Sequence, residues 1–114
     1  MEIRKKREAP EKDGAKRLIK EMTRHGWDVH RLNVSAGEYS TVGFPDYYAT
    51  HKLHGSRWIE TKTHTGKLLV SQIERFSRFA AHNIGVWVLT DELDYEKLFQ
   101  PSNWGKFSWG KHFG

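Results

Sequence analysis

The chain has 114 residues, a formal net charge of +5 and no cysteine. This length suits one domain, predicted over residues 1–114, and a hydrophobic content of 37% is sufficient for a core without disulfides. The lack of cysteine excludes thiolate zinc sites and fits a reducing compartment, so we expect a cytoplasmic or other intracellular protein. No apolar run is long enough for a membrane span or a signal peptide, and the basic balance favours a polyanionic partner.

The start of the chain predicts a basic arm followed by a helix. Residues 1–10 are expected to be flexible and solvated, which also allows their basic side chains to touch a DNA backbone. These side chains are Arg4, Lys5, Lys6 and Arg7. Apolar residues at helical spacing between Ala15 and Met22 predict a helix over residues 11–25, with Asp13 as a candidate N-cap and Gly26 as its end.

Four strands and a second helix complete the predicted core. The predicted strands cover residues 27–33, 46–50, 57–63 and 86–89. Ser71 is the candidate cap of the second helix, which runs to about His82. The first three strands can form an antiparallel meander, while the crossover through the second helix makes the last strand parallel to the third. Residues 11–90 therefore predict an α/β fold of order αβββαβ, with a four-stranded mixed sheet flanked by helices.

Residues 91–114 form an aromatic and basic extension, in which Leu93–Phe99 is a candidate short helix. Beyond it, four aromatic residues are interleaved with basic ones: Trp104, Phe107, Trp109 and Phe113. These rings either fold back to cover an open face of the core or form a stacking surface for nucleic acid. Because large aromatic side chains are usually buried, we expect them to cover the core.

The strongest chemical signal comes from two neighbouring strands. Asp46 begins the second strand, and Glu60 and Lys62 lie on the third. Alternation along a strand puts Glu60 and Lys62 on one face together with Trp58, and turns Thr61 to the other face. Because Asp46 belongs to the adjacent strand, its carboxylate can point to the same place as that of Glu60.

Two carboxylates and an ammonium group are what metal-assisted hydrolysis of a phosphodiester needs. Asp46 and Glu60 are predicted ligands of Mg²⁺ or Mn²⁺, and the backbone carbonyl of Thr61 is a further candidate ligand. A bound ion would polarise the phosphate, and Lys62 would orient or deprotonate the attacking water. Taken singly, Asp46 is typical of a turn, and Glu60 with Lys62 is typical of a surface pair. The combination with the predicted fold favours a catalytic site.

A wider set of residues matches the pattern of a known family. It consists of Gly43-x-Pro45-Asp46, Ile59-Glu60-Thr61-Lys62, Thr65-Gly66-Lys67-Leu68, Gln72, Glu11-Lys12 and the helix end at Gly26-Trp27. On these residues the chain resembles the PD-(D/E)XK nuclease superfamily, and most closely its small stand-alone VRR-NUC nucleases, which are related to Holliday-junction resolvases. The match covers roughly residues 11–90. Two departures are Tyr47-Tyr48, where an aliphatic pair is commoner, and Thr61, where valine is commoner.

The resemblance implies a restriction-endonuclease-like core and a metal-dependent endonuclease that cuts DNA. It implies Mg²⁺ as the cofactor, with Mn²⁺ as a substitute, and no organic cofactor. Asp46 and Glu60 would bind the metal, and Lys62 would be the catalytic lysine. Gln72 would position water or phosphate, and Glu11 would be an auxiliary acid that is also a candidate metal ligand.

Other residues complete the predicted site. Glu21, on the same helix, is the alternative to Glu11 as the auxiliary acid. His64 and Lys67 follow the third strand and, with the basic arm, are the predicted contacts to nucleic acid.

Two other functions compete with this interpretation. Seven histidines suggest a histidine-metal nuclease, but the spacing of His51, His54 and His64 matches no histidine metal motif. A DNA- or RNA-binding module without catalysis would keep the same fold, although the presence of both acids and the lysine favours an enzyme.

The motifs do not indicate which form of DNA is the substrate, but the size of the chain favours one kind of recognition. A chain of this length has little surface for reading bases, so we expect selection of branched or junction DNA by its structure. Junction resolution takes two cuts, which predicts a homodimer. The small size also suggests a phage or mobile-element origin.

Overall fold

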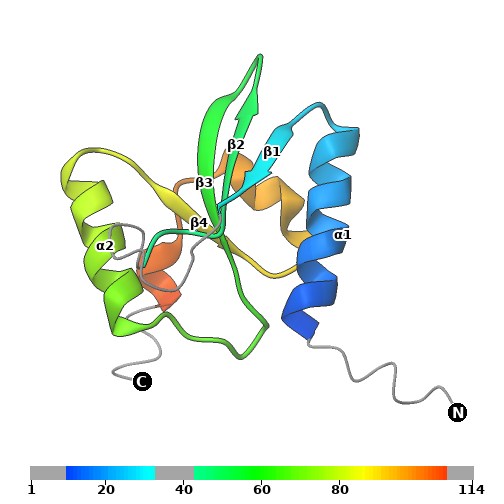
Figure 1. Cartoon of the computed structure of the whole chain (residues 1–114). Coiled ribbons are helices and arrows are strands. Elements are labelled where there is room, and N and C mark those ends of the chain that lie inside the picture. Colours follow the sequence, from blue (N-terminus) through cyan, green and yellow to red (C-terminus); the bar gives the residue numbers. More distant parts are fainter. Residues whose placement is uncertain (1–9, 33–42, 108–114) are drawn as a thin grey trace, which may run out of the picture.

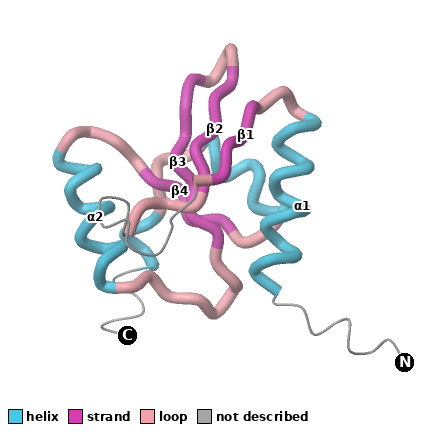
Figure 2. The backbone as a smooth tube through the Cα atoms, viewed as in Figure 1, coloured by secondary structure: helices cyan, strands magenta, loops and turns pink. Residues whose placement is uncertain are grey.

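The computed structural model describes residues 10–32 and 43–107, so the basic arm Arg4–Arg7 lies outside the described residues. Figures 1 and 2 show the arrangement of the helices and strands. They are α1 (Pro10–Arg24), β1 (Asp28–Arg31), β2 (Tyr47–His51), β3 (Gly55–Thr61), α2 (Val70–Ala81), β4 (Val86–Leu89) and the 3-10 helix η3 (Glu92–Phe99). The predicted order of the elements is confirmed. None of the described helices is long and apolar enough to cross a membrane.

The four strands form one mixed sheet in the order β1-β2-β3-β4. β1, β2 and β3 pair antiparallel in turn, whereas β4 pairs parallel to β3. A parallel neighbour requires a crossover connection, and α2 supplies it. The predicted meander with a parallel fourth strand is therefore confirmed. Because β3 and β4 run in the same direction, their carboxyl ends meet at one end of the sheet.

Helices cover the sheet on both faces, with α1 on one side and α2 on the other (Figure 1). The cluster beneath α1 and η3 contains Leu18, Met22, Trp27, Tyr47, Ala49, Ile59, Leu89, Tyr95 and Leu98. The cluster beneath α2 contains Leu68, Phe76, Val86 and Val88. β3 therefore contributes to both layers: Ile59 lies in the α1 cluster, and Trp58 packs against the α2 cluster.

The strands end one residue short of two predicted site residues. Asp46 precedes β2 and Lys62 follows β3, although the sequence predicts both inside strands. Ladder hydrogen bonds nevertheless continue past the strand ends. The N–H of Leu32 donates to the carbonyl of Asp46 (2.8 Å), and the N–H of Lys62 donates to the carbonyl of Leu89 (3.0 Å). The backbone of each site residue therefore keeps one ladder hydrogen bond beyond the end of its strand.

The C-terminal extension closes one side of the core. The predicted short helix is confirmed as η3. Trp104 and Phe107 pack against the α2 cluster, so the covering role is confirmed for these two rings, while Trp109 and Phe113 lie outside the described residues. The side-chain amide of Asn103 bonds both the N–H (2.7 Å) and the carbonyl (3.0 Å) of Val88 and so covers the outer edge of β4.

Close contact brings the first turns of α1 to the end of β4. The helix begins at Pro10 rather than at an Asp13 cap, because proline needs no N–H in the first turn. A Cβ atom on Gly14 would lie 2.3 Å from the carbonyl oxygen of Thr90, which follows β4. Glycine at this position thus allows the backbone of α1 to touch the end of the sheet where β3 and β4 finish.

We expect Gly14→Ala to lower the free energy of unfolding by about 1–3 kcal/mol, because the added methyl group forces α1 away from Thr90. Helix propensity alone predicts the opposite, a gain of about 1 kcal/mol. Urea unfolding followed by circular dichroism measures the difference. Lys16→Ala, on the exposed face of the same helix, is the control and should stay within about 0.5 kcal/mol of wild type. A Gly14→Ala protein as stable as wild type would contradict the close packing.

Candidate functional site

The two predicted carboxylates and the lysine converge at the end of β3. Oδ2 of Asp46 accepts hydrogen bonds from the backbone N–H of Thr61 (2.9 Å) and from its hydroxyl group (2.7 Å). The residues on either side of Thr61 are Glu60 and Lys62, and Nζ of Lys62 lies 3.4 Å from Oε2 of Glu60. Thr61, predicted only as a carbonyl ligand, therefore joins Asp46 to the other two residues.

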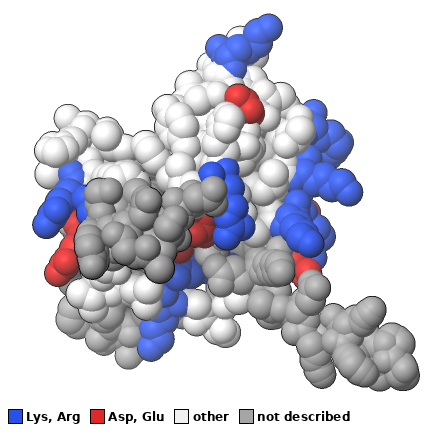
Figure 3. All heavy atoms as spheres, in the orientation of Figure 1, with Lys and Arg blue, Asp and Glu red and all other residues white. Residues whose placement is uncertain are grey.

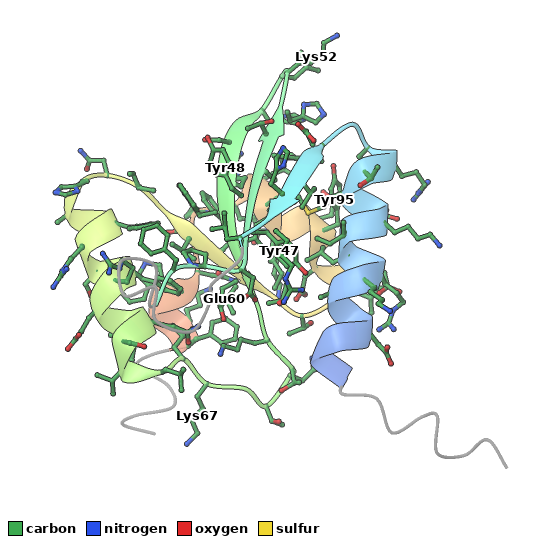
Figure 4. All side chains as sticks on the ribbon, in the orientation of Figure 1. Tyr47, Tyr48, Lys52, Glu60, Lys67 and Tyr95 are labelled. Carbon is green, nitrogen blue, oxygen red and sulfur yellow. The ribbon has the colours of Figure 1, made fainter. Side chains whose placement is uncertain are left out.

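Glu60 is almost fully buried between the sheet and α2 (Figure 4), with only 2% of its surface exposed. It shares its face of β3 with Trp58 and Lys62, as the predicted alternation requires. Oε2 of Glu60 accepts a hydrogen bond from Nε2 of Gln72 (2.8 Å) in addition to the contact with Lys62, whose side chain is 14% exposed. Burial of a carboxylate is costly unless such partners offset it.

Gln72 connects the start of α2 to this carboxylate. Its Oε1 accepts a hydrogen bond from the N–H of Leu69 (2.8 Å), one of the donors that lack a partner at the start of a helix. With the amide oxygen fixed there, Nε2 faces Glu60. The prediction that Ser71 caps α2 is wrong, because Leu69 occupies the N-cap. Gln72 thus orients Glu60, and a contact from Gln72 to water or phosphate stays a prediction.

The acidity of Glu60 is strongly altered by its surroundings. Burial and, to a smaller extent, the nearby charge of Asp46 raise the pKa of Glu60 from an ordinary value of 4.5 to about 7. Lys62 and Gln72 act in the opposite direction because they stabilise the charged form. A carboxyl group that loses its proton near neutrality is more typical of a functional site than of a surface ion pair.

The donor groups at this end of the sheet fit a hard metal ion. Among the described residues, Oε1 of Glu60 is a buried side-chain oxygen with no hydrogen-bond partner. Buried polar atoms normally have a partner, so this oxygen is positioned for a group outside the chain. A Mg²⁺ or Mn²⁺ ion held by one or two carboxylates and water would satisfy it. Asp46 and Glu60 are the residues that would hold the ion, and the carbonyl of Thr61 as a ligand stays a prediction.

The turn before β2 determines where Asp46 lies. Gly43 has a φ of +83°, a conformation that favours glycine, and a Cβ atom on it would lie 2.5 Å from the carbonyl oxygen of Ser71 in α2. The chain therefore passes directly against the first turn of α2, and the buried Pro45 then leads into Asp46. This contact explains why a glycine precedes the aspartate at this point of the sequence.

The two candidate acids of α1 lie near opposite ends of the helix, roughly 15 Å apart along its axis. Glu11 is in the first turn, close to the end of β4, but its side chain lies outside the described part of the chain, and its role stays a prediction. Glu21 bonds Arg24 (2.7 Å) and His25 (3.0 Å), and these two partners lower its pKa. The structure does not bring Glu21 to the site.

The loop after β3 carries the two predicted contacts to nucleic acid. His64 is 78% exposed, and its Nε2 lies 3.5 Å from Oδ2 of Asp91 rather than against Lys62. Lys67 is exposed and extends from the loop below Glu60 (Figure 4). Sequence reasoning missed Asp91, which follows β4 and caps η3. No local pattern could have revealed its proximity to His64, because only the parallel pairing of β3 with β4 brings them together.

The histidines of the β2–β3 hairpin have other partners. Nδ1 of His51 accepts from the N–H of Leu53 (3.0 Å), and its Nε2 lies 3.0 Å from the carbonyl of His25. The ring of His54 packs 4.8 Å from that of Phe99. Within the described ranges, no three or more His, Cys, Asp or Glu side chains are grouped so that they could hold a metal ion.

No protein-family model, curated protein or solved structure matches this chain. The chemical interpretation of the site therefore depends on its own geometry, and above all on the buried carboxylate of Glu60, whose Oε1 has no partner among the residues that the structure describes.

We expect Glu60→Gln to remove a pH-dependent loss of stability. The folded protein binds the Glu60 proton more tightly than the unfolded chain does, since the pKa rises from 4.5 to about 7 on folding. The wild type must therefore lose stability relative to the variant as the pH rises through this window, by about 2–3 kcal/mol between pH 5 and pH 8. Urea unfolding in the presence of EDTA across this pH range measures the difference.

The matched control is Glu96→Gln, which changes the same type of residue at an exposed position on η3. Its stability should run parallel to that of wild type at every pH. Parallel curves for wild type and Glu60→Gln would show that the Glu60 carboxyl has an ordinary acidity, against this prediction.

Proposed function

We propose that this protein is a metal-dependent endonuclease that hydrolyses DNA phosphodiester bonds on a restriction-endonuclease-like core. One observation carries the proposal: Oε1 of Glu60 is buried beside Asp46 and Lys62 and has no hydrogen-bond partner in the described part of the chain. A purely structural acid would have both oxygens bonded. The mixed sheet between helices, in the order αβββαβ, supports the proposal because it is the arrangement that the family resemblance implies.

Each residue of the candidate site has a proposed role in the reaction. Asp46 and Glu60 would hold Mg²⁺ or Mn²⁺, and an ion bound there stabilises negative charge on the phosphate and makes a bound water more acidic. Lys62, within 3.4 Å of Glu60, would orient the attacking water and offset the charge that develops in the transition state. Gln72 keeps Glu60 in place, and Thr61 does the same for Asp46.

Basic side chains and helix ends both suit a nucleic-acid backbone. Four basic side chains lie exposed along the outer face of α1, across the sheet from α2, where Figure 3 shows them as a blue band: Lys16, Arg17, Lys20 and Arg24. Two of them are paired with acids, Arg17 with Glu92 and Arg24 with Glu21. The N-terminal ends of α1 and α2 both approach the end of the sheet that holds the site. Helix N-termini carry a partial positive charge that favours phosphate groups.

We further propose branched or junction DNA as the substrate and a homodimer as the active form. Two cuts in one junction are most directly made by two sites related by two-fold symmetry. Sedimentation that shows a monomer, both alone and with a junction, would argue against junction resolution.

We expect the protein to cut nucleic acid in the presence of Mg²⁺ or Mn²⁺, and Lys62→Ala, Glu60→Gln and Asp46→Asn each to reduce the rate by about a hundredfold or more. Each variant removes one group that would act on the phosphate, the ion or the water. The measurement is the single-turnover rate on five DNA substrates: junction, flap, nicked duplex, linear duplex and single strand.

Lys97→Ala is the matched control for Lys62→Ala, because Lys97 is half-exposed and pairs with Asp94 on η3. Its cleavage rate should equal that of wild type. If the wild-type protein binds DNA and never cuts any of the five substrates, the non-catalytic binding module replaces the nuclease as the better explanation.

Metal affinity should depend on pH through Glu60. Because the pKa of this carboxyl is about 7, a proton and a metal ion compete for it below neutrality. We expect the Kd for Mn²⁺, measured by calorimetry, to rise about tenfold for each pH unit below 7 and to level off above it. Glu60→Gln, which has no such proton, should bind Mn²⁺ more weakly and without this dependence. A flat wild-type profile from pH 5.5 to pH 8 would be inconsistent with Glu60 as a ligand.

A further inference from the structure

A row of aromatic rings crosses the sheet immediately beside the catalytic residues. Tyr48 on β2 pairs directly with His30 on β1 and with Trp58 on β3. Directly opposed residues of neighbouring strands point to the same face. The three rings therefore lie in line on the face that carries Glu60, and Figure 4 shows Tyr48 on the side of the hairpin toward α2, opposite to Tyr47.

The side chains on this face become more exposed to solvent from β4 to β1. Val86, the β4 partner of Trp58, is fully buried beneath α2. Trp58 and Tyr48 are each partly exposed, and the side chain of His30 is 62% exposed. The β1–β2 half of this face thus presents rings that α2 does not cover.

Packing holds the two central rings in place. The centroids of Tyr48 and Trp58 are 4.5 Å apart, and their planes are tilted by 45°. Trp58 also makes edge-on contacts with Phe44 (6.2 Å) and Phe79 (5.4 Å). Because Trp58 is held in this way and in turn supports Tyr48, little conformational freedom is lost when a flat ligand stacks on the ring of Tyr48.

The row lies two residues along β2 and β3 from the proposed catalytic residues. Tyr47 pairs with Ile59, so extension of this register by one residue places Asp46 opposite Glu60. Asp46 and Tyr48 are two residues apart, as are Glu60 and Trp58, a separation of roughly 7 Å. A stacked strand advances about 3.4 Å per nucleotide, so one or two nucleotides span the distance.

We propose that Tyr48, with Trp58 packed against it, stacks an unpaired base next to the phosphate that is cut, which makes DNA with a single-stranded segment the substrate class. The inference rests on the proposed nuclease function. Aromatic side chains stack on any base, whereas bases within a duplex already have both faces covered by their neighbours. Sheets with exposed rings on one face bind single strands in this way in other folds. The net charge of +5 complements the phosphates of such a strand.

The test compares binding of a fluorescein-labelled dT15 strand with binding of a blunt hairpin duplex, by anisotropy in EDTA so that nothing is cut. Tyr48→Leu should raise the Kd for dT15 about tenfold or more and change that for the duplex less than twofold. Tyr48→Phe keeps the ring and should bind dT15 within twofold of wild type. Binding of dT15 should also quench tryptophan fluorescence, and Trp58→Phe should remove most of that quenching.

Phe99→Leu is the matched control, because Phe99 is 41% exposed and packs with Tyr95 and His54, which belong to the other face of the sheet. It should leave the affinity for dT15 unchanged, and equal melting temperatures for Tyr48→Leu and Tyr48→Phe exclude a folding defect. The inference is overturned if Tyr48→Leu binds dT15 as wild type does, if it weakens both probes equally, or if wild type does not bind dT15.

The cleavage experiment separates this inference from the nuclease proposal. If the protein binds dT15 through Tyr48 but cuts no substrate, the stacking surface is supported and the nuclease function is contradicted. If it cuts duplex and single strand equally and Tyr48→Leu has no effect, the nuclease function is supported and the stacking surface is contradicted.

Discussion

The buried carboxylate of Glu60 is the constraint on which this end of the molecule depends. A carboxylate withdrawn from water needs compensating partners, and here Lys62 and Gln72 supply only part of the compensation, while Asp46 adds a repulsive charge. Within residues 10–32 and 43–107, the second oxygen of Glu60 has no partner. This is a local cost that a folding role does not explain and that binding of a cation would relieve.

The same carboxylate couples three segments that are distant in the sequence. Gln72 uses one end of its amide to complete the first turn of α2 and the other to hold Glu60. Gly43 lets the chain pass against that turn, which delivers Asp46 to the neighbouring position. These contacts therefore hold the start of α2, the end of β3 and the turn before β2 together. A site that must keep reacting groups in register needs such support from the residues around it.

Local patterns predicted the elements because periodicity and apolar runs are local properties. The continuous apolar run Val86–Leu89 gave β4 correctly, and strand alternation placed Glu60 and Lys62 on one face. Contacts that depend on the crossover were beyond such patterns. Ser71 is a favourable cap by residue type, yet the amide of Gln72 serves Leu69 instead. The pairing of His64 with Asp91 depends in the same way on how β3 and β4 lie side by side, which no short window of sequence contains.

The two departures from the pattern of the nuclease family that the sequence resembles acquire a physical meaning in the structure, and together they bear on the proposed substrate. The hydroxyl of Thr61, which valine would lack, holds Asp46, and the ring of Tyr48, which an aliphatic residue would lack, extends the row beside Glu60. A base inside a duplex must leave its stack before it can reach that row, at a cost of a few kcal/mol. Stacking on an aromatic side chain returns about 1–3 kcal/mol per base. The balance is close to neutral for a paired base and clearly favourable for one that is already unpaired, so the proposed stacking on Tyr48 would favour DNA whose strand has been opened before it binds.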